Sequence, residues 1–296
     1  MTSAANPRYD LAIAYRVYPE VSKPARSLPF GDDKYLLSEV CFRSFKESLG
    51  ALRATIWVLL DSCPPEYEAL FRRYVDADDL VIVRLDRAGN RATFAKQIEI
   101  LLEQGDADVV YFAEDDYFYL PGQFQEILEF LIAHDDVDFV SPHDHPDCYR
   151  LDLHRGPKWL RTYGSHHWRT AASTCLTFLT RKDTLARHES VVRSYARGND
   201  DCAMWLSLTK RRVFNPVAPI RYLLQGLFYW KILVKAWLYG WRQILFGRRR
   251  HLWVPVPGIA THLDATGLGP NVDWIALMQQ RITEQRMMEQ RIEVKV

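Results

Sequence analysis

The feature that most constrains this chain is the regular alternation, over its first 116 residues, of short apolar runs with longer amphipathic segments. The apolar runs at 9–18, 54–61, 79–86 and 107–116 are apolar on both faces and predict buried strands. The segments at 38–50, 66–75 and 93–105 predict helices. Buried strands separated by helices predict an α/β fold with a mainly parallel sheet covered on both faces.

The amino-acid composition favours a globular protein and argues against a nucleic-acid-binding one. The 296 residues are 48% hydrophobic, which suits a globular chain, and no internal repeat or low-complexity segment is present. Lys and Arg number 38 against 37 Asp and Glu, for a net charge of +1. This balance argues against nucleic acid as a partner, because such binding draws on an excess of basic charge.

Cysteine usage and the N-terminus bear on location. The 5 cysteines are widely spread and form no CxxC pair, as is typical of a reducing compartment. Residues 1–10 lack a basic stretch followed by an apolar one, so no signal peptide is expected. We therefore expect a cytoplasmic protein.

Acidic residues gather where the fourth predicted strand ends. In such a sheet, ligands bind beyond the carboxyl ends of the strands. Glu114, Asp115 and Asp116 are adjacent there, and three neighbouring carboxylates repel one another unless a cation or donors neutralise them. Strand alternation would put Glu114 and Asp116 on one side, where they suit Mg²⁺ or Mn²⁺. The alternative is a solvated acidic loop in which an Asp caps the next helix.

The order of the strand ends resembles the glycosyltransferases of GT-A fold, in particular the large inverting family 2. The segments that carry the resemblance are LAIAYRVYPE, VLLDS, RAGNRATFAKQIEIL, VVYFAEDDYFYLPG, GNDDCAMWLSL and PGIATHLD. It implies a Rossmann-like, mostly parallel sheet with flanking helices, a nucleoside-diphosphate sugar as donor and Mn²⁺ or Mg²⁺ as cofactor. The chain departs from the family's DxD motif because Glu114 occupies its first position.

The resemblance also implies roles for single residues. The implied metal ligands are Asp116, Glu114 and His262. The implied donor-binding residues are Tyr15, Arg16, Asp61, Arg91, Lys96, Glu114 and Asp115. The implied general base is Asp201, with Asp200 as the second candidate.

Each of these roles has a structural alternative. Asp61 suits the N-cap of the helix that follows it, and Asp200 or Asp201 suits the N-cap of the helix beginning near 203. Arg91 and Lys96 are cations in a helical context, where such side chains are commonly only solvated.

The segment 141–173 is rich in histidine. We expect His143, His145, His166 and His167 to line an acceptor pocket, because imidazoles hydrogen-bond to and stack on sugars. The alternative is a zinc site formed by His143, Asp144, His145, Asp147 and Cys148, although no second ligand cluster supports it.

A basic, aromatic segment occupies 221–250. Lys231 and Lys235 interrupt its apolar run, so it is not expected to span a membrane. Lys231, Lys235 and Arg242 share one helical face, and apolar residues fill the remainder, as in a helix lying in a membrane interface. The run 248–250 would add attraction to anionic lipid. The alternative is a helix packed on the catalytic domain or on a dimer partner.

Three regions follow: a GT-A catalytic domain at 1–220, an amphipathic segment at 221–250, and a C-terminal segment at 251–296. The last would return to the active site and end in a helix that offers a homodimer contact. We expect a metal-dependent inverting glycosyltransferase of surface polysaccharide synthesis, acting on a glycan or lipid-linked acceptor at the inner face of the cell membrane. The alternatives are a nucleotidyltransferase, disfavoured because the segment after the first strand lacks glycines, and a non-catalytic carbohydrate- or membrane-binding module.

Overall fold

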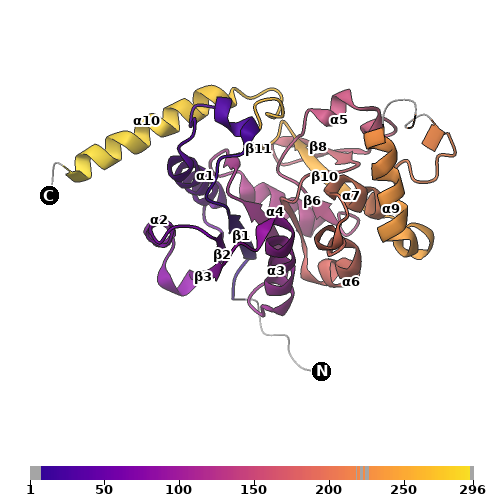
Figure 1. Cartoon of the computed structure of the whole chain (residues 1–296), viewed down its shortest axis with the longest axis horizontal. Coiled ribbons are helices and arrows are strands. Elements are labelled where there is room, and N and C mark those ends of the chain that lie inside the picture. Colours follow the sequence, from indigo (N-terminus) through magenta and orange to yellow (C-terminus); the bar gives the residue numbers. More distant parts are fainter. Residues whose placement is uncertain (1–7, 218, 221–222, 224–226, 294–296) are drawn as a thin grey trace.

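The computed structural model describes residues 8–217, 219–220, 223 and 227–293. Within them, nine strands form one sheet in the order β3-β2-β1-β4-β9-β6-β10-β8-β7 (Figure 1). Their pairings make seven strands run in one direction and two, β9 and β8, in the other. The expected mostly parallel sheet is therefore present, with antiparallel strands only in its second half.

The parallel half is made by the four strands that the apolar runs predict. They are β1 (Leu11–Val17), β2 (Ala54–Asp61), β3 (Leu80–Leu85) and β4 (Val109–Glu114). β1 lies between β2 and β4, with Arg16 opposite Glu114 in the register. All seven residues of β1 are buried, as expected of a strand covered on both faces.

Helices cover both faces of the sheet. On one face, the core is closed by α1 (Lys34–Leu49), α2 (Glu66–Tyr74) and α4 (Phe124–Ala133). On the other, it is closed by α3 (Gly89–Glu103), α6 (Lys182–Val192) and α7 (Asp201–Thr209). The alternation of β1 sends Ile13 to the first core and Ala12 to the second, which fixes the register of the strand.

The rest of the sheet comes from later parts of the chain. Its strands are β6 (Phe139–Val140), β7 (Leu160–Tyr163), β8 (His166–Ala171), β9 (Phe178–Arg181) and β10 (Leu252–Val256). A small second sheet pairs β5 (Tyr117–Tyr119) with β11 (Ala260–His262). Short helical turns lie at α5 (Asp147–Arg150), η1 (Lys23–Ser27), η2 (Ala77–Asp79), η3 (Asp152–His154) and η4 (Tyr195–Arg197). Since β10 lies between β6 and β8, the segment after 250 completes the sheet that the first 220 residues begin.

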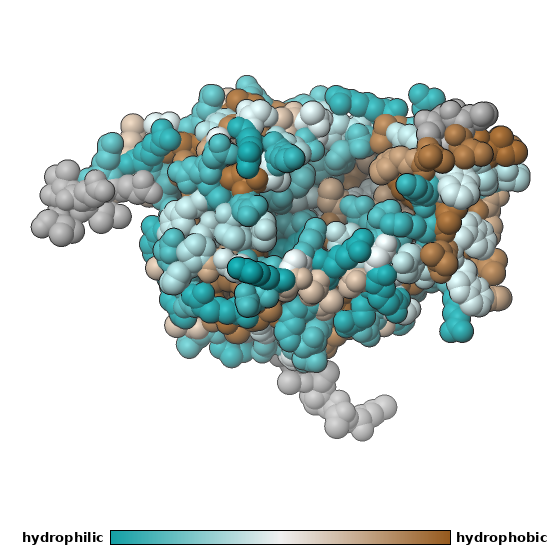
Figure 2. Space-filling model, in the orientation of Figure 1, coloured by the Kyte–Doolittle hydropathy of each residue, from teal (hydrophilic) through white to brown (hydrophobic). Residues whose placement is uncertain are grey.

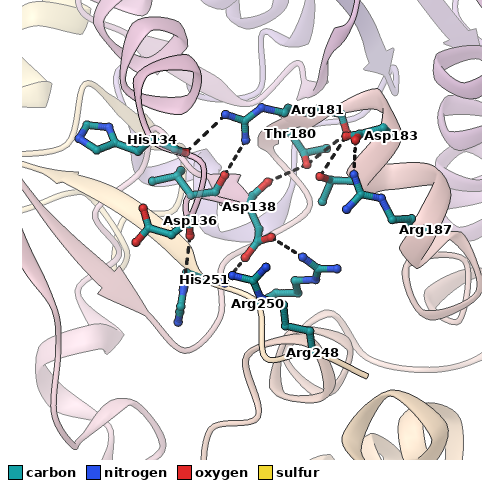
Figure 3. A network of polar contacts seen from close by, with 12 residues as sticks. His134, Asp136, Asp138, Thr180, Arg181, Asp183, Arg187, Arg248, Arg250 and His251 are labelled. Atoms are coloured by element: carbon teal, nitrogen blue, oxygen red, sulfur yellow. Dashed lines mark hydrogen bonds and ion pairs between the residues drawn. The ribbon is translucent and has the colours of Figure 1, made fainter. Parts of the chain in front are cut away.

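A buried ionic network fixes the start of β10 (Figure 3). Asp138 accepts hydrogen bonds from Nη1 of Arg250 and from the backbone N–H of His251, both at 2.8 Å. Arg250 is only 8% exposed. The expectation that Arg250 attracts lipid is therefore wrong, because its charge is neutralised inside the protein by Asp138.

Two long helices close the chain. α9 (Leu227–Phe246) packs on α7, and α10 (Trp274–Glu293) packs on α1 and extends beyond the sheet (Figure 1). The contact of α9 is close: a Cβ added to Gly240 would come within 2.2 Å of Ser207 Oγ. No helix in the described part of the chain is long and apolar enough to cross a membrane.

Candidate active site

A cavity of about 560 Å³ opens beyond the carboxyl ends of β1, β2 and β4. Acidic and basic side chains from widely separated parts of the chain line it together: Arg16, Lys34, Asp61, Glu114, Asp115 and Asp116. Its position at the carboxyl edge of a parallel sheet is where α/β folds bind ligands.

The acidic cluster lies in a tight turn. β4 ends at Glu114, and Asp115 and Asp116 form the turn that leads into β5. All three residues line the cavity. Asp115 contacts Lys34 and Ser38 of α1, whereas Glu114 contacts Arg16, so these two carboxylates point to different sides, as expected. Each of the three carboxylates has a different partner.

Glu114 is held by Arg16. The Arg16 guanidinium forms an ion pair with Glu114 and hydrogen bonds to the side chain and carbonyl of Asn90. The second oxygen of Glu114 accepts a hydrogen bond of 2.8 Å from Thr177 Oγ1. Both carboxylate oxygens of Glu114 thus have protein partners, so it is a poor candidate for a metal ligand.

Asp115 is neutralised by Lys34. The Lys34 ammonium lies 2.7 Å from Oδ2 of Asp115, and Ser38 Oγ donates to the same oxygen at 3.1 Å. Burial alone would lower the pKa of Lys34, but the attraction of Asp115 outweighs it and raises that pKa. The pair is neutral overall, and it holds the Lys34 ammonium in place at the cavity wall.

Asp116 is paired with His262. Nε2 of His262 lies 3.2 Å from Oδ2 of Asp116, while Oδ1 of Asp116 is buried without a hydrogen-bond partner. Burial opposes both charges, yet mutual attraction lowers the pKa of Asp116 and raises that of His262 to about 9. A proton is thus held on His262 at neutral pH in this ligand-free arrangement.

The described residues contain no group of three or more His, Cys, Asp or Glu side chains that could hold a metal ion. The expected set of Asp116, Glu114 and His262 is therefore not assembled, because Arg16 engages Glu114. Asp116 and His262 remain: a free, buried carboxylate oxygen beside an imidazole is a donor set that suits Mn²⁺. A cation held by so few protein groups completes its shell with water and substrate phosphates.

Asp61 caps a helix, though not the expected one. Its two carboxylate oxygens accept hydrogen bonds from the backbone N–H groups of Ala88 (2.9 Å) and Gly89 (2.7 Å), at the start of α3. Gly89 has a φ of +74°, which favours glycine. Asp61 therefore fixes the loop that carries Asn90 to Arg16, in addition to lining the cavity.

Three of the expected donor-binding residues are not among the cavity's lining residues. Tyr15 is fully buried and packs edge-on against Phe42, on the core side of β1. Lys96 forms an ion pair with Glu99 on its own helix. Arg91 is exposed on α3 and is not among the cavity's lining residues.

The two candidate bases lie at the start of α7 and differ in their surroundings. Oδ1 of Asp200 lies 2.8 Å from Nζ of Lys235 on α9, so Asp200 is already paired. Asp201 accepts one hydrogen bond, of 2.6 Å, from the backbone N–H of Cys202. Burial, followed by the charges of Glu114 and Asp200, raises the pKa of Asp201. Asp201 is not among the cavity's lining residues, but the charge of Glu114, which lines the cavity, acts on its pKa.

None of the four histidines expected at an acceptor pocket is among the residues that line this cavity. His143 is 1% exposed and bonds through Nδ1 to the carbonyl of Ala260 at 3.3 Å. His166 is buried against Glu126 of α4. His145, whose Nδ1 accepts from the Asp147 backbone, and exposed His167 are also outside the cavity lining.

The zinc alternative has no support among the described residues, which contain no ligand cluster. The Asp144 carboxylate is instead occupied by Arg169 and by the hydroxyl of Tyr149, at 2.5 Å.

The sequence analysis missed three polar groups of the site: Lys34, Asn90 and Thr177. Lys34 lies at the start of a helix and Thr177 just before a strand, both outside the segments that carry the resemblance, whereas Asn90 lies within one of those segments, next to Arg91. The only available signal was indirect: three adjacent carboxylates require counter-charges, and Lys34 immediately follows a helix N-cap, Asp33.

Comparisons with known proteins add resemblances of low similarity. No family model matches the chain, and no curated protein matches its sequence. Among solved structures, it overlaps the glycosyltransferase GlyE of Streptococcus pneumoniae TIGR4 with 10% identity and a TM-score of 0.43, covering 94% of this chain and 60% of that one. It also overlaps a galactosyltransferase, LgtC, in complex with donor and acceptor sugar analogs. That overlap has 8% identity and a TM-score of 0.40, and it covers 92% of this chain and 95% of that one.

A cytidylyltransferase from Leptospira borgpetersenii gives 13% identity and a TM-score of 0.35, covering 62% of this chain and 65% of that one. The chain thus spans less than two thirds of the length of GlyE and of the cytidylyltransferase. At these TM-scores the overlaps assign neither a family nor an activity to this chain.

Proposed function

We propose that this protein is a glycosyltransferase that moves a sugar from a nucleoside diphosphate to an acceptor hydroxyl. The observation that carries the proposal is the cavity wall, where a buried carboxylate oxygen of Asp116 is left unpartnered between His262 and the Lys34–Asp115 pair. A diphosphate needs positively charged groups around it and a ligand for its counter-ion. At this wall the Lys34 ammonium is such a group, and the unpartnered oxygen of Asp116 is such a ligand.

In this proposal the nucleoside lies toward Asp61 and Gly89, and the diphosphate lies toward Lys34 and Asp116. Asp116 and His262 would hold Mn²⁺ or Mg²⁺. The cation would stabilise, as a Lewis acid, the negative charge that develops on the departing diphosphate. Lys34 adds a second positive charge that is fixed before the donor arrives, so little reorganisation is required during reaction.

Asp201 serves as the general base. It accepts the proton of the acceptor hydroxyl as that oxygen bonds to the anomeric carbon and the bond from carbon to the diphosphate oxygen breaks. A raised pKa suits this task, because a more basic carboxylate binds the proton more firmly. Attack on the face opposite the leaving group inverts the anomeric centre.

The acceptor in this proposal is a glycan or a lipid-linked glycan of a surface polysaccharide. Because such acceptors are held at a lipid surface, the proposal includes peripheral attachment to the inner face of the membrane.

A screen of nucleotide sugars tests the proposal. The expected result is that one of them raises the melting temperature in the presence of MnCl₂ and is slowly hydrolysed, with the released sugar inverted at the anomeric carbon when followed by NMR. The matched variants are Asp116→Asn, which should lose the hydrolysis, and Asp147→Asn, outside the cavity, which should retain it.

Two results would overturn the proposal. Release of pyrophosphate from a nucleoside triphosphate and a sugar phosphate would identify a nucleotidyltransferase instead. Stabilisation by a sugar without any turnover would identify a binding module.

A further inference from the structure

The helix α9 has two apolar faces. Its buried face contacts α7 and is made of Ile232, Leu233, Ala236, Gly240 and Ile244. A second stripe, at helical spacings of three and four residues, remains exposed: Leu227, Trp230, Val234, Leu238, Trp241 and Leu245. Packing on the protein therefore leaves a part of the helix's apolar surface uncovered.

The exposed stripe continues onto the preceding segment. Phe214 (57% exposed) and Ile220 (66% exposed) lie in the chain just before α9. A groove of about 440 Å³ runs between this segment and α9, lined by Val213, Trp230, Trp237 and Leu238 among others. Figure 2 shows the same region as a brown area on the side of the molecule where α9 lies. Isolated exposed apolar residues are ordinary, but a contiguous patch of this kind marks an interaction surface.

The charged residues of the segment that carries the patch are of one sign, although Asp152, Asp200 and Asp138 from other segments pair with Arg212, Lys235 and Arg250. From 202 to 263 the sequence contains ten Lys and Arg and no Asp or Glu, although the whole chain has a net charge of only +1. Of the remaining cations, Lys231 and Arg242 are exposed beside the stripe, and Arg248 is exposed just beyond its end.

More cations meet at one end of α9. Arg211 follows α7 and Arg249 follows α9, yet they lie close enough that burial together with the charges of Arg249 and Arg212 lowers the pKa of Arg211. Arg249 also donates through Nε to the carbonyl of Thr209 at 3.0 Å, which holds this end of the patch in place. Cations that repel one another in the free protein are relieved when an anionic surface covers them.

We propose that the stripe on α9, residues 213–217 and 219–220, and the surrounding cations form a docking surface for an anionic lipid bilayer. Large apolar and aromatic side chains flanked by Lys and Arg are the pattern of an element that lies in the interface plane. A second copy of this chain would present the same positive charge and be repelled, which argues against self-association through this face. The inference gives the proposed membrane attachment a defined surface and partner, and in that respect it rests on the proposed function.

The docking surface is joined to the candidate site. The face of α9 opposite the stripe packs on α7, whose first residue is Asp201, and Lys235 on α9 pairs with Asp200. Docking through the stripe would thus bring the start of α7 near the lipid surface, where a lipid-linked acceptor presents its hydroxyl.

Co-sedimentation of the full chain with vesicles tests the inference, without donor or acceptor. We expect the protein to bind vesicles of phosphatidylcholine that contain about 30% phosphatidylglycerol, and to bind little to vesicles of phosphatidylcholine alone. Lys231→Glu with Arg248→Glu should weaken partitioning at least ~20-fold, since each basic residue near the surface contributes. Leu238→Ser with Trp241→Ser should also weaken it, because the apolar face no longer enters the interface.

Matched control variants show whether binding depends on where the substituted residues lie or only on the change in charge or hydrophobicity. Arg53→Glu with Arg72→Glu changes the net charge equally on another part of the surface, and Ile132→Ser with Val81→Ser removes exposed apolar groups elsewhere. Both controls should bind like wild type. Equal binding to both vesicle types, or unchanged binding by the α9 variants, would overturn the inference, as would a dimer in free solution that Leu238→Ser with Trp241→Ser dissociates. Because no turnover is measured, failure here is distinct from failure of the proposed sugar transfer.

Discussion

The imidazole Nε2 of His262 lies 3.2 Å from Oδ2 of Asp116, although 146 positions separate the two residues in the chain. The contact joins β11, near the C-terminus, to the acidic turn after β4. His262 itself is not among the residues that line the cavity, but it contacts Asp116, which does line it. The contact also places a titratable proton where we propose that a divalent cation binds.

The first prediction concerns the dependence of stability on pH. His262 has a pKa of about 9 in the folded protein, above the ~6.5 of a free histidine. Its contribution to the free energy of unfolding is therefore complete below pH ~6.5 and is lost as the pH rises through about 9. Urea unfolding of metal-free protein should show stability falling across this window.

The variant His262→Gln should flatten that fall, because the titrating group is gone. The control is His167→Gln, whose side chain is exposed. If His262→Gln shows the same loss of stability between neutral and alkaline pH as wild type, the ion pair with Asp116 does not have the strength we assign to it.

The second prediction concerns the buried pair of Lys34 and Asp115. Replacement of Lys34 by Met leaves the Asp115 carboxylate buried without a counter-charge and should cost about 3–5 kcal/mol in the free energy of unfolding. The double variant with Asp115→Asn should recover part of the loss, because the uncompensated charge is removed. A double-mutant cycle in urea measures the coupling, and additive losses would contradict the pair.

The third prediction concerns Asp61. Asp61→Ala removes the acceptor for two backbone N–H groups at the start of α3 and should cost ~1–2 kcal/mol, in the range of helix caps. Asp76→Ala is a suitable control, because Asp76 precedes a 3₁₀ turn and makes no side-chain cap hydrogen bond. Equal losses in both variants, measured by urea unfolding, would show that Asp61 does not act as a cap.

The fourth prediction concerns the general base. Asp201→Asn should lower kcat by ~10²–10⁴-fold, the usual contribution of a positioned base. Because the pKa of Asp201 is raised, the acid limb of the pH–rate profile should lie above the ~3.9 of an ordinary aspartate, with activity increasing as Asp201 loses its proton.

The matched variant is Asp200→Asn, which alters the neighbouring carboxylate. Its pair with Lys235 is partly exposed, so kcat should fall less than ~10-fold. A larger loss in Asp200→Asn than in Asp201→Asn would reverse the assignment of the base.

The first half of the fold was predictable because its signals are local. The run at 54–61 coincides with β2. The ends of the other three apolar runs each lie within two residues of the ends of β1, β3 and β4. A strand buried on both faces must be apolar along its whole length, and no distant residue is needed to recognise it.

The remainder depends on contacts between distant residues. Nothing near 252–256 indicates that this segment inserts between β6 and β8, since pairing with strands that are distant in the sequence leaves no local mark. Likewise, the partner of Asp115 is Lys34 and that of Glu114 is Arg16, and both pairs are set by how α1 and β1 meet the acidic turn. The acidic turn could be recognised from the sequence as a candidate site. Which residue pairs with each of its carboxylates could not be predicted from the sequence.

The central claim is that Asp116 binds a divalent cation together with a nucleoside diphosphate. Calorimetric titration tests this claim most directly. Wild type and Asp116→Asn are each titrated with a panel of nucleoside diphosphates, once in the presence of MnCl₂ and once in the presence of EDTA. We predict that one diphosphate binds wild type only with Mn²⁺, that binding releases the proton held on His262, and that Asp116→Asn weakens it at least ~10-fold. Binding of equal affinity in EDTA, or in Asp116→Asn with Mn²⁺, would contradict the claim.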